Sequence, residues 1–145
     1  MTPELWARER IIDLNTSAGS RVYTKKLPQR PTLPAVRVQR IGNRQDQHLR
    51  GPQPFFTRVQ VDSFVAEDSV SPGTTIETLA EAIKGDGLGY NASGLWGFKG
   101  ESDGSPAILI ENVTLLHDGT ADYEGDELKL LRIRQDYGIF WRAAA

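Results

Sequence analysis

Few side chains in this sequence could do chemistry. The two histidines, His48 and His117, come first because imidazole binds metals and transfers protons near neutral pH. Neither has a second histidine or a cysteine at ligand spacing. The chain has no cysteine, which excludes a thiolate nucleophile, a disulfide and a cysteine-ligated metal centre. We therefore expect no metal, no cofactor and no catalytic site, and predict that the protein is not an enzyme.

Two other stretches match ligand-binding loops only in part. The glycine-rich run at 85–89 follows a predicted helix where a phosphate loop would open one, and no Lys-Ser/Thr pair comes after it. Four polar residues have the alternate spacing of a calcium loop: Asp118, Thr120, Asp122 and Glu124. Tyr123 stands where that loop requires glycine, and Lys129 stands where it requires glutamate. We interpret these stretches as a helix terminator and a solvated acidic connection.

The composition is that of one soluble domain over residues 1–145. With 39% hydrophobic and 25% charged residues, the chain is long enough to bury a core without metals or disulfides. No run approaches the roughly 18 apolar residues that a membrane span needs, and the first residues lack the layout of a signal peptide. We expect a protein made in the cytoplasm, with no membrane partner.

The net charge of −2 conceals two oppositely charged halves. Residues 1–60 hold eleven Lys/Arg and four Asp/Glu, a balance of +7, and residues 61–145 hold six and fifteen, a balance of −9. This division is compatible with a nucleic-acid footprint on the basic half or with two complementary protein surfaces. Alternatively, strands from the two halves interleave in space and cancel the field.

Two helices are predicted. Thr2-Pro3-Glu4 is a typical helix start, and we expect that helix to end near Ala18-Gly19. Thr74-Thr75-Ile76-Glu77 fits a capping box, which predicts the start of the second helix. That helix has an apolar stripe at helical spacing and a terminating glycine: Ile76, Leu79, Ala80, Ile83 and then Gly85.

Four strands are predicted by alternating apolar and polar residues: 35–41, 58–65, 108–116 and 128–141. Residues 21–36, with three prolines, predict an extended connector, and 85–106 an ordered loop. The order α-β-β-α-β-β predicts an α+β fold, with a roughly four-stranded antiparallel sheet and both helices on one face. The other face carries charges of alternating sign, which suit either solvent or a subunit interface.

Residues 40–56, "RIGNRQDQHLRGPQPFF", predict a long β-hairpin arm that is polar and basic until it ends in two phenylalanines. Arginines and aromatic rings of this arm could contact phosphates and stack on bases, which would make the protein a nucleic-acid-binding accessory. The sequence pI of about 5.7 and the lack of a lysine-rich patch argue against that alternative.

Three stretches resemble the tail-completion, or tail-terminator, family of long-tailed bacteriophages. "LPAVRVQRIGNRQDQHLRGPQPFFTRVQVDSFV" is similar to that family's paired strands and polar hairpin. "TTIETLAEAI" followed by "LWGFKG" is similar to its next helix and Gly-aromatic-Gly turn, and "LKLLRIRQDYGIFWR" to its closing strand. The sequence departs from the family in the length of 85–94 and in the acidic connection 119–127.

The resemblance implies a virion structural protein at the head–tail interface. Such proteins form a ring, expected to be a hexamer, that caps the tail tube, ends its growth and joins it to the head connector. DNA passes through the lumen without specific binding. The implied partners are other copies of the chain, the tail tube protein and the head connector or adaptor protein. A head-completion or connector ring one layer higher in the neck is the alternative within the same class.

The residues that we expect at a subunit or tube interface lie in the arm and on the polar sheet face: Arg40, Arg44, Gln45, Gln47, His48, Arg50, Phe55, Phe56, Arg58, Arg132, Arg134 and Asp136. Five aromatic residues are candidate apolar anchors: Phe55, Phe56, Trp96, Phe98 and Phe140. A simpler explanation, stronger for Phe140 than for Phe55, is that some of them close the core.

Overall fold

The computed structural model describes residues 1–45, 55–88, 92–124 and 130–144. In this part of the chain the helices are α1 (Pro3–Asp13) and α2 (Pro72–Lys84). The strands are β1 (Val22–Thr24), β2 (Ala35–Gln45), β3 (Phe55–Ala66), β4 (Gly100–Glu101), β5 (Ile108–Asp118), β6 (Asp122–Glu124) and β7 (Leu130–Ala143). The α+β class is as predicted.

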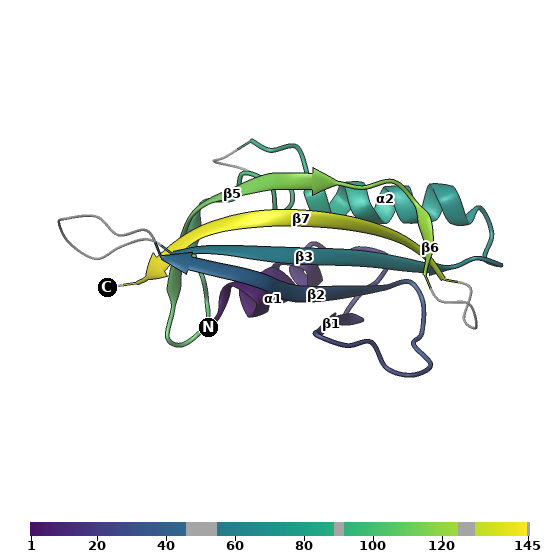
Figure 1. The fold of residues 1–145 in the computed structure, drawn as a ribbon, viewed down its shortest axis with the longest axis horizontal. Coiled ribbons are helices and arrows are strands. Elements are labelled where there is room, and N and C mark those ends of the chain that lie inside the picture. The colour runs from purple at the N-terminus through teal and green to yellow at the C-terminus, as the bar shows by residue number, and fades with distance from the viewer. Residues whose placement is uncertain (46–54, 89–91, 125–129, 145) are drawn as a thin grey trace.

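The strands form one curved sheet in the order β1-β2-β3-β7-β5-β4, and β6 also pairs with β7 (Figure 1). The four predicted strands are present as β2, β3, β5 and β7, and neighbours among them run antiparallel. The prediction of a purely antiparallel, four-stranded sheet was incomplete. β1 lies parallel to β2 inside the expected connector, β4 lies in the expected loop and β6 in the acidic connection. Strands of two or three residues are too short to show a periodic pattern.

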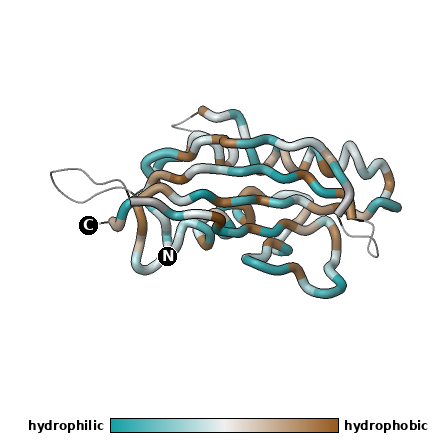
Figure 2. The backbone as a smooth tube through the Cα atoms, viewed as in Figure 1, coloured by the Kyte–Doolittle hydropathy of each residue, from teal (hydrophilic) through white to brown (hydrophobic). Residues whose placement is uncertain are grey.

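Both helices cover the same sheet face, as predicted. Along β3 and β7, hydrophilic and hydrophobic positions alternate (Figure 2), and the odd-numbered residues face the helices. The main core combines residues of both helices with residues of five strands, among them Trp6, Ala7, Ile11, Leu79, Ile83, Val22, Val36, Val38, Val59, Val61, Val113, Tyr137 and Ile139. Burying each large aliphatic side chain of this set contributes roughly 1.5–3 kcal/mol to folding.

α1 starts as predicted but ends early. The Leu5 N–H donates to Thr2 Oγ1 at 3.3 Å, so threonine is the N-cap. The helix ends at Asp13 instead of near Ala18-Gly19, and Asn15 follows in the left-handed region at φ 56°. Asparagine tolerates that conformation and can stop a helix without glycine.

α2 begins two residues before the predicted capping box. Pro72 takes the first turn, where its fixed φ suits a helix, and Ser71 is the N-cap residue without a side-chain cap bond. The predicted apolar stripe is confirmed because Ile76, Leu79, Ala80 and Ile83 are all buried. Gly85 ends the helix at φ 76°, and a Cβ there would lie 2.3 Å from the Gly94 nitrogen, so only glycine fits.

Candidate assembly interface

The sheet face opposite the helices has its charged side chains in register across strands. On this face, even-numbered residues of β3 and β7 are cross-strand neighbours of odd-numbered residues of β2, up to the bulge of β2 at Ile41. One cross-strand row is Arg37, Asp62 and Arg134, and the next is Gln39, Gln60 and Asp136. We call the sheet face that carries these rows, opposite the helices, the outer face. Cross-strand neighbours stand close enough for opposite charges to pair.

Asp62 is the acceptor at the centre of the first row. Arg37 donates to its Oδ2 from Nε at 3.2 Å and from Nη2 at 2.8 Å. Gln60 Nε2 donates to the same oxygen at 3.0 Å. Arg37 also lies over the ring of Phe64, 5.3 Å from its centroid. Three donors and an aromatic ring therefore fix the position of one ion pair between β2 and β3.

Asp136 is the acceptor of the second row and binds two arginines. Its Oδ2 accepts from Arg58 Nη2 at 2.9 Å and from Arg134 Nη2 at 3.3 Å. Arg58 comes from β3 and Arg134 from β7, so the carboxylate links neighbouring strands. The predicted site residues Arg58, Arg134 and Asp136 are thus brought together.

On the outer face, the arginines that bind the aspartates of the two rows are at least partly exposed, and those aspartates are buried. Asp62 and Asp136 are both 0% exposed, whereas the side chains of Arg58 and Arg134 are 46% and 45% exposed. On each aspartate the second oxygen, Oδ1, is buried and has no hydrogen-bond partner among the described residues. The outer face therefore presents arginine outward and keeps the carboxylates beneath it. The sequence shows alternating charges here but not which sign reaches the surface.

Two aromatic pairs lie where the predicted arm joins the sheet. Phe55 stacks on Trp141 with centroids 4.8 Å apart, and Phe56 packs against Phe140, also at 4.8 Å. Trp141 Nε1 donates to Thr57 Oγ1 at 2.8 Å, which holds the first pair in place. The two phenylalanines alternate along β3, so the pairs lie on opposite faces of the sheet. Both phenylalanines pack against their own chain and remain partly exposed.

The other anchor candidates have separate positions. Phe98 packs against Trp6 with ring centroids 5.0 Å apart, and Arg10 lies over Phe98 at 4.9 Å. Phe98 thus lies at the edge of the core. Phe140, for which core closure was the stronger expectation, is partly exposed and lies outside the buried core clusters. Trp96 is 37% exposed.

The remaining predicted interface residues do not gather at one site. Arg40 faces the helix side and lines a cavity of about 410 Å³ with Thr2, Glu4 and Leu5. Arg132 pairs with Asp122 at 3.4 Å. Arg44 and Gln45 are strand positions of β2. Gln47, His48 and Arg50 lie outside the described residues, as does the tip of the predicted arm. For all of them, a role in assembly stays a prediction.

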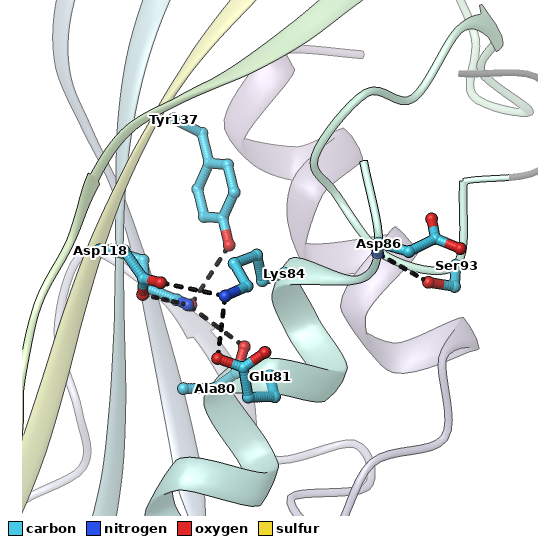
Figure 3. Close-up of polar contacts among 8 residues, drawn as sticks. Ala80, Glu81, Lys84, Asp86, Ser93, Asp118 and Tyr137 are labelled. Atoms are coloured by element: carbon cyan, nitrogen blue, oxygen red, sulfur yellow. Dashed lines mark hydrogen bonds and ion pairs between the residues drawn. The ribbon is translucent and has the colours of Figure 1, made fainter. Parts of the chain in front are cut away.

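A second polar cluster, which sequence reasoning missed, joins α2 to β5 and β7 (Figure 3). Gln135 is fully buried and donates from Nε2 to Asp118 Oδ1 at 3.1 Å and to the Ala80 carbonyl at 3.2 Å. The Tyr137 hydroxyl donates to Gln135 Oε1 at 3.2 Å. The only signal in the sequence was a glutamine interrupting the apolar face of the last strand.

Lys84 closes this cluster at the end of α2. Its Nζ lies 2.9 Å from Glu81 Oε1 and 3.1 Å from Asp118 Oδ2. The hydrogen bonds to Glu81 and then Asp118 raise the pKa of Lys84. Burial disfavours ionised Asp118, but hydrogen bonds from Gln135 and Lys84 outweigh it and lower the pKa of Asp118. Burial raises the pKa of Tyr137, so its phenol stays protonated.

The glycine-rich loop after α2 is held by local hydrogen bonds. The Asp86 N–H donates to Ser93 Oγ at 3.0 Å (Figure 3), and the Leu88 N–H donates to Asp86 Oδ1 at 3.1 Å. The bond from Leu88, first among several backbone contacts, lowers the pKa of Asp86. Both bonds lie in the first part of the loop that the sequence predicted at 85–106.

In the described part of the chain, no group of three His, Cys, Asp or Glu residues could hold a metal ion. The described helices include none that is long and apolar enough to cross a membrane.

The two charge halves do not interleave. Residues 1–60 supply β1, β2 and half of β3, and later residues supply the rest of β3 and then β7, β5 and β4. Figure 1 shows this as purple-to-blue strands at one edge of the sheet and green at the other. Over the described residues, the strands of the first, basic segment therefore lie toward one edge of the sheet and those of the second, acidic segment toward the other. The strands of the two segments thus do not alternate in the sheet, but their charges still pair across it, because Arg37 of the first segment binds Asp62 of the second and Arg58 binds Asp136.

No family model matches the sequence, and no curated protein matches it. Among solved structures, a chain of the "Virion of native gene transfer agent (GTA) particle" is 11% identical. That match has a TM-score of 0.51 and covers 92% of each chain. A second structure, 14% identical, covers 94% of this chain and 86% of its own with a TM-score of 0.42. The first likeness shows that this protein shares the fold of a chain in that virion.

Proposed function

We propose that this protein is a virion structural protein that forms a ring at the head–tail interface. The ring, a hexamer, caps the tail tube, ends its growth and joins the tail to the head connector. Its partners are other copies of the chain, the tail tube protein and the head connector protein. DNA passes through the lumen without specific binding.

The observation that carries this proposal is the fold shared with a virion chain along 92% of both sequences. The sequence resemblance to tail terminators supports the same proposal. It covers the paired strands, the second helix and the closing strand, all of which are elements of the observed fold. The virion role rests on the shared fold, and the terminator role rests on the sequence resemblance.

The outer face and the charge arrangement suit a ring. A ring uses head-to-tail contacts, so each copy needs two different and complementary surfaces. The outer face supplies outward arginines, fixed from below by Asp62 and Asp136. Fixed guanidinium groups lose little side-chain entropy when they meet a partner's acceptors.

Electron microscopy of the purified protein mixed with tail tubes of its own virion tests the function. We expect tubes of fixed length with an added ring at one end, and light scattering should show a ring or a concentration-dependent assembly. A protein that stays monomeric at high concentration, and that tail tubes do not change, contradicts the proposal. A ring that leaves tube length unlimited but binds the head connector favours the connector alternative.

The predicted arm has its own test. Deleting residues 43–50, which removes the last three residues of β2 together with the arm beyond them, should leave a folded monomer that no longer assembles, with circular dichroism as the control for folding. Rings and capped tubes made by the deletion variant would show that the arm is dispensable.

For the nucleic-acid alternative, DNA binding should fall steeply with salt and be weakened in Arg44→Ala/Arg50→Ala.

A further inference from the structure

The sheet has an open edge on its basic side. β1 pairs with β2 only at Val36–Val38, whereas the pairing of β2 with β3 continues to Gln45. Among the described residues, no strand lies beside β2 from Arg40 onward. The Val36 N–H bonds to Arg21 O at 3.0 Å and Val38 O accepts from the Lys25 N–H at 3.1 Å, so even-numbered residues point to this edge. Arg40, the next in alternation, therefore directs its backbone N–H and C=O outward.

The acidic side of the sheet has a second open edge. β4 pairs with β5 only at Leu109 and Ile110, and the Gly97 N–H donates to Val113 O at 2.8 Å. Beyond Val113, no strand in the described part of the chain flanks β5. The Val113 carbonyl points away from β7, and the register is regular up to Leu115. The backbone groups of Leu115 therefore also face the open edge.

Each open edge also presents one aliphatic side chain at a β-bulge. Ile41 lies at the bulge of β2 and Leu116 at the bulge of β5, and each is 45% exposed. Bulges often protect an edge from pairing, and natural edges are commonly blunted by lysine or proline. Residues 39–45 and 114–118 contain neither lysine nor proline, and the charges they do carry are of opposite sign, Arg40 and Arg44 on β2 and Asp118 on β5.

The directions of the strands make these edges compatible. β2, β3, β7 and β5 alternate in direction, so the two edge strands run in opposite senses. Rotation about an axis along the strands therefore brings β5 of one copy antiparallel to β2 of the next. Antiparallel pairing gives the better hydrogen bonds, and the segments of opposite net charge are brought together.

We propose that the β2 edge from Arg40 to Gln45 pairs with the β5 edge from Thr114 to Asp118 of a second copy of this chain. The sheet then continues across the subunit boundary, and Ile41 and Leu116 are covered there. This inference rests on the ring of the proposed function, and it specifies how neighbouring subunits join.

Cross-linking between introduced cysteines tests the pairing, because the natural chain has no cysteine. The variants are Ile41→Cys, Leu116→Cys and the double variant, treated with mild oxidant or a short bis-maleimide. Two strands separate β2 from β5, so at about 4.8 Å per strand the two introduced thiols of one chain lie too far apart for a disulfide. Val70→Cys/Leu116→Cys is the control, since Val70 is 90% exposed and lies outside both edges.

The expected result is a covalent ladder from the double variant, reaching the size of the wild-type assembly. Each single variant should stay uncross-linked, and an equal mixture of the two should give a heterodimer and nothing larger. The control double variant should give no ladder. These patterns are specific to a head-to-tail joint between two different edges.

Two outcomes overturn the pairing. If wild-type protein forms rings but the mixed single variants give no heterodimer above background, the subunits join elsewhere and the ring survives without this joint. If each single variant dimerises alone as readily as the mixture, the contact joins like edges. A wild-type protein that remains monomeric with and without tail tubes overturns both the ring and its joint.

Discussion

Arg37 donates two hydrogen bonds, at 2.8 and 3.2 Å, to one carboxylate oxygen of Asp62, a residue that solvent does not reach. The arginine side chain itself is 20% exposed. The Arg37 guanidinium therefore pairs with the buried Asp62 carboxylate and also helps to shield it from solvent. This relationship makes Arg37 structural as well as a surface residue.

Arg37→Met should destabilise the protein because it leaves the Asp62 carboxylate with only Gln60 as a donor. We expect the free energy of unfolding in urea to fall by about 2 kcal/mol, below the full cost of an unpaired buried charge because the shorter side chain admits water. Arg142→Met is the matched control, since Arg142 and Glu111 form a pair that is 48% and 38% exposed. That change should cost less than about 1 kcal/mol. Equal losses in the two variants would contradict a special role for the Asp62 pair.

Gly138→Ala should disturb the aromatic pair on the outer face. An added Cβ would lie 2.5 Å from Phe56 Cε2 and 2.8 Å from Thr114 Oγ1. Because Phe56 is already packed on Phe140, we expect a loss of about 1–3 kcal/mol in thermal or urea unfolding. Gly73→Ala is the control, because nothing lies within 4 Å of a Cβ there. Its effect should be neutral or slightly stabilising; a Gly138→Ala variant as stable as wild type would show that Phe56 moves freely.

Gln135 and Tyr137 should be energetically coupled. Gln135→Leu leaves the buried Tyr137 hydroxyl without its acceptor, and we expect it to cost about 2 kcal/mol. Tyr137→Phe leaves Gln135 Oε1 without that donor and should cost about 1 kcal/mol. The double variant should lose less than the sum of the two single losses in urea denaturation. Strict additivity would mean that this hydrogen bond contributes nothing to stability.

Asp118→Asn should change how stability depends on pH. The pKa of Asp118 is lower in the folded chain than in the unfolded chain, so its contribution is present above about pH 4 and is lost as pH falls through the folded pKa. At pH 7 we expect the variant to lose about 0.5–1 kcal/mol, because Asp118 is about a third exposed and solvent screens the pair. The difference from wild type should shrink below pH 4 in urea titrations at several pH values.

Lys84 sets the upper pH limit of the stabilisation that this cluster provides. Its pKa is raised on folding, so its stabilising contribution is complete below about pH 10 and is lost only as pH rises further. The Asp118→Asn effect should therefore be constant from about pH 5 to pH 9. Glu9→Gln, in an exposed pair with Arg8, is the control and should change stability by less than about 0.5 kcal/mol. A pH-independent Asp118→Asn effect down to pH 2 would contradict this account.

Local patterns were enough to predict the long elements. The stripe from Ile76 to Ile83 and the alternation along the last strand require specific buried faces, and both are observed. Short strands were missed because β1, β4 and β6 exist only through their pairing with longer neighbours. The start of α2 was misplaced because two start signals lie within four residues, and proline at the first turn prevailed over the threonine box.

The candidate site was predictable in its residue types but not in its arrangement. Sequence alternation placed Arg58, Arg134 and Asp136 on the polar face, where the structure joins them through one carboxylate. It placed Arg37 and Asp62 on the same face but could not show that they pair, because their contact depends on the register between β2 and β3. Nor could it identify Gln135 and Lys84 as neighbours, because they lie on different elements about fifty residues apart.

The sequence by itself determined the helices, the four long strands, their buried faces and two halves of opposite charge, because these depend on residue type and on periods of 2 and 3.6. Only the tertiary structure decided that the strands of the two halves lie toward opposite edges of one sheet, that arginines cover the carboxylates, and that β2 and β5 each have an edge without a neighbouring strand among the described residues. Strand order and register are set by contacts between distant residues, and no local pattern encodes them.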